Sequence, residues 1–245
     1  MTTLGQAGAA HGFLPHKRAG EPYFPIMAIA LLAIVVGGFV GVQISPNGFE
    51  TRPITAIVAL HGLTQIAWFA LLIAQPYFVR TRQMKLHMTL GTLSVALAAL
   101  VVITGYFVTR GAYADPDWTI AQWSHSASTM LPFCDIVTFA LAYALGYRFR
   151  RSPAAHKRLM LLAGLFMIDP AMARLVTALG VFPPLILIAE FGLFASMLVY
   201  DWRTLGRPHW ASVMGLALFA AVTPLKMVVA EMPIWADTIG PALFG

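Results

Sequence analysis

Long apolar stretches, separated by short polar segments, dominate the pattern of residues along the chain. A helix that spans a bilayer needs about 20 consecutive, mostly apolar residues, and seven stretches of this kind are present. The predicted helices cover Pro25–Ile44, Pro53–Val79, Leu86–Thr109, Thr119–Tyr147, His156–Gly180, Pro183–Asp201 and Trp210–Ala230. The pattern therefore predicts an all-α integral membrane protein with about seven transmembrane helices, the last interrupted by Pro224 and Lys226.

Composition agrees with a chain that is solvated by lipid. Of the 245 residues, 59% are hydrophobic and only 11% are charged, whereas about a quarter of the residues in a soluble domain are charged. No polar stretch is long enough to fold as a second domain. We expect an N-terminal tail at residues 1–24, a transmembrane domain at 25–230 and a C-terminal tail on the outer side at 231–245.

The basic residues predict the orientation in the membrane. With a cytoplasmic N-terminus, the inner segments hold twelve cations and the outer segments only Arg52 and Arg110. The twelve are Lys17, Arg18, Arg80, Arg82, Lys85, Arg148, Arg150, Arg151, Lys157, Arg158, Arg203 and Arg207. This asymmetry is the positive-inside pattern. It explains the net charge of +6 without a nucleic-acid partner and predicts a multi-pass protein of the cell inner membrane or plasma membrane.

Four histidines mark a repeat within residues 53–180. His61 and His125 each begin an apolar run that ends in a basic loop, and His87 and His156 each begin the helix after that loop. Both units run in the same direction, as parallel repeats related by an axis along the membrane normal do. We expect helices two to five to form a central four-helix bundle, with His61 and His125 near the outer face and His87 and His156 near the inner face.

Paired histidines at two depths favour two haem groups. Two imidazoles on opposite sides of a haem saturate its iron and suit it to electron transfer, and the facing helices of a bundle can supply them. Gly105 follows His87 by 18 residues, or about five helical turns, so it is predicted to leave room for the outer haem. Gly91 is predicted to leave room beside the inner haem, and Arg174 to bind an outer propionate. Each histidine alone could instead bond a headgroup, water or a carbonyl.

The placement of His61, His87, His125 and His156 resembles the cytochrome b561 family of transmembrane dihaem cytochromes. In that family each of four central helices supplies one haem-ligand histidine. The second and fourth helices share one haem, and the third and fifth share the other. The resemblance implies two b-type haems and transmembrane electron transfer. The chain departs from the family in its seventh predicted helix, and no lysine-rich ascorbate-binding segment matches. The stretch HKRLMLLA is also similar to small bacterial proteins that assist the assembly of haem-copper oxidases.

Ionisable residues within the predicted helices are candidates for a proton or quinol site, because such residues are costly in a membrane and are often functional. They are Asp135, Asp169, Glu190 and Lys226. Depth predicts a cluster of Arg174, Glu190 and Lys226, which could serve a quinol pocket or merely join helices. Gln75 could orient His87 or His156, or bridge two helices. Cys134, the single cysteine, is predicted to be an inert packing residue.

Three functions fit these features. The first is oxidation of a quinol or small reductant with electron transfer through two haems, which would make the protein a membrane oxidoreductase. The second is an accessory or assembly subunit of a larger respiratory or photosynthetic membrane complex, favoured by the short loops and the absence of a soluble catalytic domain. The third is a proton-coupled transporter that uses Asp135, Asp169 and Glu190.

Overall fold

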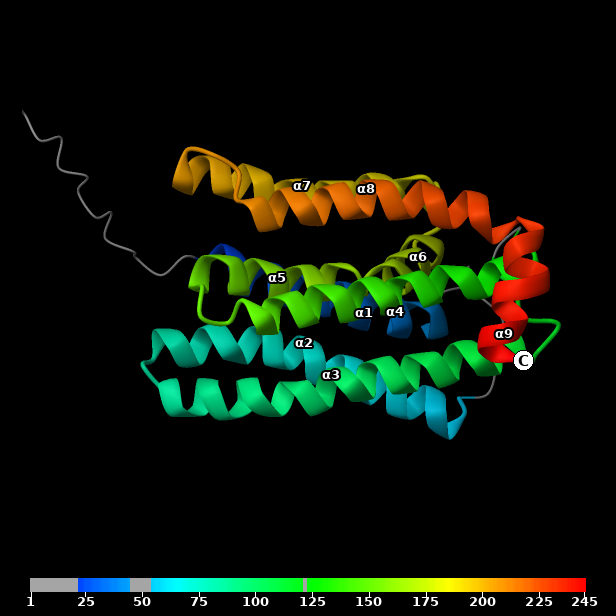
Figure 1. The fold of residues 1–245 in the computed structure, drawn as a ribbon, viewed down its shortest axis with the longest axis horizontal. Helices are drawn as coiled ribbons and strands as arrows, with labels where there is room; N and C mark the ends of the chain where they lie inside the picture. Colours follow the sequence, from blue (N-terminus) through cyan, green and yellow to red (C-terminus); the bar gives the residue numbers. More distant parts are fainter. Residues whose placement is uncertain (1–21, 45–53, 121–122) are drawn as a thin grey trace, which may run out of the picture.

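The structure, a computed structural model, describes residues 22–44, 54–120 and 123–245. These residues form helices and no strands (Figure 1). The long helices are α1 (Tyr23–Ile44), α2 (Ala56–Arg80), α3 (Met84–Tyr113), α4 (His125–Arg148), α5 (Pro153–Leu165), α6 (Asp169–Ala178), α7 (Leu185–Leu205) and α8 (Trp210–Ala230). The predicted N-terminal tail lies outside the described residues up to position 21, as do His11, His16, Lys17, Arg18 and Arg52.

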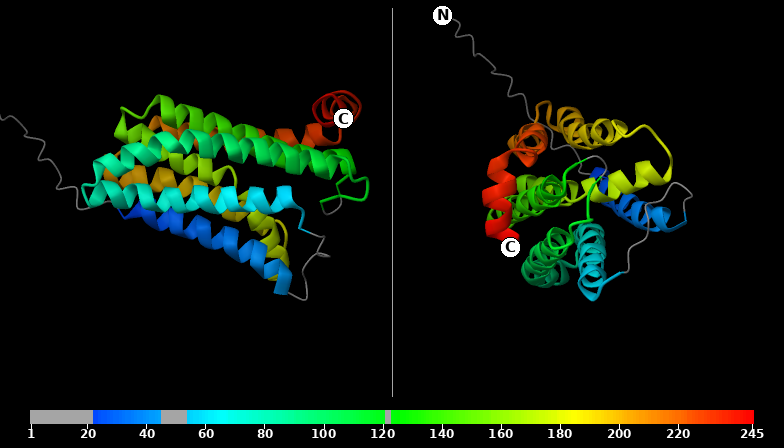
Figure 2. Two further views of the ribbon diagram at one scale, coloured as in Figure 1. Left: turned by 90° about the horizontal axis from the view of Figure 1, so that it is seen from below. Right: turned by 90° about the vertical axis from the view of Figure 1, so that its right-hand side faces the viewer.

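Six of these helices are long and apolar enough to cross a membrane, and the bent pair α5–α6 raises the number to seven if it forms one span. The six long helices and α5 run roughly parallel to one long axis (Figure 2). Large apolar side chains such as Leu63, Leu93 and Ile188 are exposed on the outside of the bundle. The all-α membrane architecture predicted from the sequence is therefore present, with lipid as the solvent of this outer surface.

The fifth predicted helix, His156–Gly180, is corrected by the structure. The chain is helical from Pro153 to Leu165 and again from Asp169 to Ala178, and the two parts are bent by 48°. Pro170 explains the break, because proline cannot donate the backbone hydrogen bond to the Phe166 carbonyl that would continue α5. An acidic residue followed by proline instead suits the first turn of a new helix, as Asp169 and Pro170 do in α6.

Helix α5 lies at the centre of the molecule. It packs against α1, α2, α4, α7 and α8, and every residue from Leu161 to Ile168 is buried. Helices α2 and α4 each contact both α3 and α5. These four helices therefore form a closed arrangement in which α2 lies diagonally opposite α4, and α3 lies diagonally opposite α5. Whether an internal repeat generated this arrangement stays a prediction.

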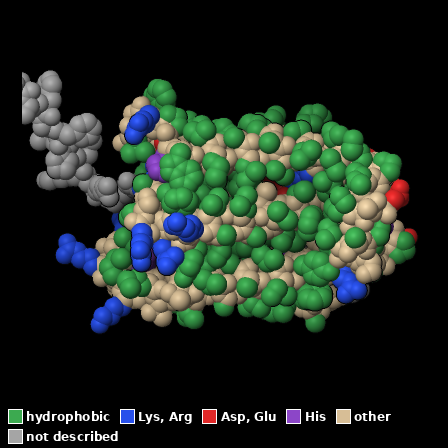
Figure 3. Space-filling view, viewed as in Figure 1, with side chains coloured by type: hydrophobic (Ala, Val, Ile, Leu, Met, Phe, Trp, Pro, Cys, Tyr) green, Lys and Arg blue, Asp and Glu red, His purple; other side chains and the backbone are tan. Residues whose placement is uncertain are grey.

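The two ends of the bundle differ in charge and in covering. Most Lys and Arg side chains gather at one end in Figure 3, and Arg80, Arg148 and Arg203 lie in the last turns of α2, α4 and α7. At the other end, the C-terminal segments Ile234–Ile239 and Gly240–Phe244 (α9) lie across the bundle (Figure 2). Residues 231–245, predicted as a tail, are thus a folded cap, held in part by the Trp235 indole N–H donating to the Ser126 carbonyl at 2.7 Å.

Candidate functional sites

The inner histidine pair occupies matching positions on diagonal helices. His87 is the fourth residue of α3, and His156 is the fourth residue of α5. Both lie just after the basic turns at one end of the bundle, and their side chains are close enough to interact electrostatically. The structure therefore places both residues at the same end of the bundle, on diagonal helices.

Hydrogen bonds orient both rings of this pair. His156 Nδ1 lies 2.9 Å from the Gly146 carbonyl oxygen, which can only accept, so Nδ1 carries the proton and the lone pair is on Nε2. The Gln75 amide of α2 contacts His87 Nδ1 and lies 3.3 Å from the Gly91 backbone nitrogen. Gln75 thus joins α2 to α3 at the predicted histidine. A methyl group added at Gly91 would meet nothing within 4 Å, so the predicted room there is open.

The outer pair, His61 and His125, is arranged differently. His61 of α2 contacts Thr104 of α3, whereas His125 of α4 contacts Tyr113. These partners are nine residues apart on α3, so the two histidines are offset by about 13 Å along the bundle. Both nitrogens of His125 lie 2.8 Å from backbone carbonyl oxygens, those of Trp118 and Tyr113. His61 Nδ1 lies 3.0 Å from the Thr104 hydroxyl. His61 Nε2 lies 3.4 Å from the Gln65 amide nitrogen, so in this arrangement both nitrogens of each outer ring have a polar neighbour.

The room predicted beside Gly105 is already occupied. A methyl group added there would lie 3.0 Å from Ile136 Cδ1 and 3.2 Å from His61 Cε1. Between the two histidine levels, the Trp68 ring packs edge-on against Phe139 and Tyr143, with ring centroids 5.1 and 5.5 Å apart. Side chains therefore fill the space beside Gly105, whereas the space beside Gly91 is open. The two predicted haems stay a prediction.

A second candidate site lies at the break between α5 and α6. Lys226 of α8 donates to Asp135 of α4 at 3.0 Å and to Asp169 of α6 at 2.7 Å. Glu190 of α7 lines the same cavity and is only 2% exposed. Its Oε1 atom is buried and has no hydrogen-bond partner. Four helices therefore bring three carboxyl groups and one ammonium group together, as the positions in the apolar stretches suggested.

Arg174 is not a member of this cluster, although depth predicted it there with Glu190 and Lys226. Its guanidinium lies 4.7 Å from the centre of the Phe39 ring on α1 and donates to the Pro170 carbonyl at 2.9 Å. The bend at the α5–α6 break redirects the helix, so residues beyond Asp169 do not keep the face expected of a straight helix. Asp135 and Asp169 take the place predicted for Arg174.

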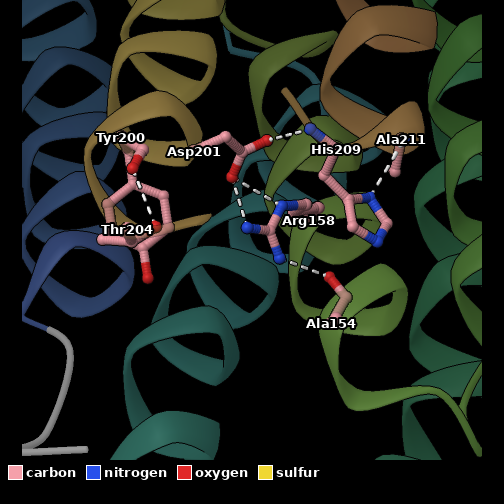
Figure 4. A network of polar contacts seen from close by, with 7 residues as sticks. All are labelled: Ala154, Arg158, Tyr200, Asp201, Thr204, His209 and Ala211. Carbon is pink, nitrogen blue, oxygen red and sulfur yellow. Dashed lines mark hydrogen bonds and ion pairs between the residues drawn. The ribbon is translucent and has the colours of Figure 1, made fainter. Parts of the chain in front are cut away.

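Sequence reasoning missed a buried ionic network at the basic end (Figure 4). Arg158 of α5 forms an ion pair with Asp201 of α7, and its Nη1 donates to the Ala154 carbonyl at 2.7 Å. The other oxygen of Asp201 accepts from the His209 backbone N–H at 2.9 Å. The sequence indicated only that Arg158 belongs to the cations of the inner segments. The signal for a partner was Asp201, an aspartate near the end of an otherwise apolar helix.

Comparisons of the chain with protein-family models, with curated proteins and with solved structures found no match. The resemblance to the cytochrome b561 family accordingly stays a prediction that rests on histidine placement.

Proposed function

We propose that the protein carries electrons in the membrane with a b-type haem held between His87 and His156. The observation that supports this proposal most directly is that these two residues occupy matching positions on diagonal helices at one end of the bundle. Two imidazole ligands would give the iron a filled coordination sphere, which suits it to exchanging single electrons. A quinol or another small reductant is the electron donor that we propose.

The surrounding residues have distinct roles in this proposal. The Gly146 carbonyl fixes the tautomer of His156, and such a bond to the far nitrogen orients a ligating histidine and makes it more basic. Gln75 orients His87 in another way: once the amide is turned, its nitrogen donates to His87 Nδ1 and its oxygen accepts from the Gly91 N–H. The open space at Gly91 leaves room for one edge of a flat ring. These contacts hold the two rings in position before a ligand enters.

The basic end of the bundle is, in this proposal, the cytoplasmic side. The clustering of Lys and Arg there (Figure 3) follows the positive-inside pattern. The haem would then lie near the cytoplasmic face. The packed Trp68, Phe139 and Tyr143 rings would fill the space between it and the outer half of the bundle.

Absorption spectra test the proposal. The full chain is expressed with added haem precursor, purified, and measured oxidised and after dithionite reduction. We expect a b-type spectrum in the wild-type protein and its loss in both His87→Ala and His156→Ala. The matched control is His125→Ala, which should keep the spectrum because His125 bonds the carbonyls of Tyr113 and Trp118. A colourless wild-type protein, or haem retained in both inner variants, would overturn the proposal.

Gln75→Leu gives a finer test of the same site. This variant keeps both ligands but removes the polar partner of His87. We expect haem binding to persist and the midpoint potential to change, because outer contacts tune the basicity of a ligand. An unchanged potential would show that Gln75 only bridges α2 and α3.

A further inference from the structure

The cluster at the α5–α6 break holds more negative groups than it can pair. Asp135 and Asp169 both bond Lys226, whereas Glu190 approaches the same cavity with a buried oxygen that has no hydrogen-bond partner. A buried charge is costly unless it is paired, and an unpaired carboxylate is instead neutralised by a proton. One ammonium group leaves two of three carboxylates uncompensated. Asp169 is 30% exposed and reaches solvent, so the buried, unpartnered Glu190 is the group that needs another positive charge.

The size of the cavity restricts what can supply that charge. Its volume is about 20 Å³, which is enough for about one water molecule. A quinol head group would not fit without opening it, since pockets for such ligands are many times larger. In the described ranges, no group of three His, Cys, Asp or Glu side chains is placed to hold a metal ion. A proton that is delivered through a water molecule fits the small volume and needs no set of metal ligands.

The cavity also has an opening to the side of the bundle. The Asp169 side chain is 30% exposed, whereas Asp135 and Lys226 are only 10% and 6% exposed. Figure 3 shows acidic and basic atoms in a hollow of the apolar surface between α8 and α4, beside the α5–α6 break. Breaks in membrane helices are tolerated where they line a cavity that contains water, and they form ion sites in transporters. Asp169 is therefore placed between the buried carboxyl of Glu190 and the exterior.

We infer that Glu190 is an exchangeable proton-binding site, reached from outside the bundle past Asp169. In the binding step, a hydronium ion in the cavity gives its proton to the Glu190 carboxylate, which leaves a carboxylic acid and a water molecule. The titratable groups facing Glu190 are Asp135 from α4, Asp169 from α6 and Lys226 from α8, with Cys134 beside Asp135. Lys226 keeps its two aspartate partners in both states, so only Glu190 changes its charge.

Infrared spectroscopy of the full chain in lipid tests this inference. A protonated carboxyl group has a carbonyl stretch that a carboxylate lacks, and the band shifts when the proton is replaced by deuterium. We expect such a band at neutral pH, a shift of it in D2O, and its complete loss in Glu190→Gln. The matched control is Asp237→Asn, a change at an exposed position in the C-terminal cap, which should keep the band.

Two further variants test the route past Asp169 and the independence of this site from the proposed haem. Asp169→Asn should keep the band and slow its shift in D2O, because the exposed relay is removed. The haem-free variant His87→Ala should behave as the wild type, which separates this inference from the proposed electron transfer. A wild type without the band, a band retained in Glu190→Gln, or a band that never exchanges in D2O would overturn the inference.

Discussion

Two buried ionic networks lie at different depths of this bundle, and they differ in how their charges are balanced. At the basic end, one arginine meets one aspartate, and backbone groups complete both side chains. At the α5–α6 break, one lysine faces three carboxyl groups beside a cavity, and one buried oxygen is left without a partner. A satisfied network holds helices together, whereas an unbalanced one with room for water can bind and release a charge.

The largest expected effect comes from breaking the balanced network. Asp201→Ala leaves the Arg158 guanidinium buried without a counter-ion, and removing one partner of a buried pair costs about 3–5 kcal/mol. Thermal unfolding of the purified protein should show this loss. The double variant Arg158→Met with Asp201→Leu should recover most of it, because apolar residues of similar volume often replace a buried pair without loss. If the Asp201→Ala protein were as stable as the wild type, this network would not stabilise the fold.

Breaking the unbalanced network should cost less. Lys226→Met removes the donor to Asp135 and Asp169, and unsatisfied buried acceptors cost about 1–3 kcal/mol. The cost stays below that of Asp201→Ala because Asp169 is 30% exposed and water can reach it. Thermal unfolding of both variants under the same conditions makes the comparison. Asp169→Asn, which leaves Lys226 its bond to Asp135, is the matched control and should be milder. Equal losses for Lys226→Met and Asp201→Ala would contradict the distinction between the two networks.

The sequence predicted the helices better than it predicted how their side chains meet. Helix α8 runs from Trp210 to Ala230 as predicted, through Pro224 and Lys226, because lysine in a span is tolerated when neighbouring helices supply partners. The break at Asp169 was missed because the apolar pattern continues across it. The acidic residue and the proline that follows it were the local signal, and they outweigh the hydrophobic pattern for backbone geometry.

For the candidate sites, sequence position indicated the depth of each residue in the membrane but not which neighbouring helix its side chain faces. Depth alone correctly grouped Glu190 with Lys226, yet it placed Arg174 there instead of Asp135 and Asp169. The inner histidines lie at matching positions of α3 and α5, because both follow a short basic turn and are the fourth residue of their helix. The outer histidines do not share a register, because α4 begins at His125, after a loop that was predicted as helix. The direction in which a side chain points depends on where its helix begins and bends, and an apolar pattern does not define either.

The smallest expected effect concerns a residue at the edge of the balanced network. His209 lies in the turn before α8, outside the membrane-spanning helices, and its Nδ1 accepts from the Ala211 N–H at 3.1 Å (Figure 4). Partial burial holds the pKa of His209 below its ordinary value, and the nearby charge of Arg158 lowers it further. The unfolded chain therefore takes up this proton at a higher pH than the folded protein, and stability falls as pH falls through about 6.5.

His209→Asn isolates this contribution, because asparagine keeps an acceptor for the first turn of α8 but does not titrate. We expect the wild type and the variant to unfold at similar temperatures near pH 8 and to separate below about pH 6.5, with the wild type losing more stability. The difference should be small, since solvent screens a side chain that is only half-buried. All other histidines are common to both proteins, so their effects cancel. If the unfolding temperatures of the two proteins change with pH in parallel, protonation of His209 does not affect stability. The balanced network would then be insensitive to pH, in contrast to the proton-binding site inferred at Glu190.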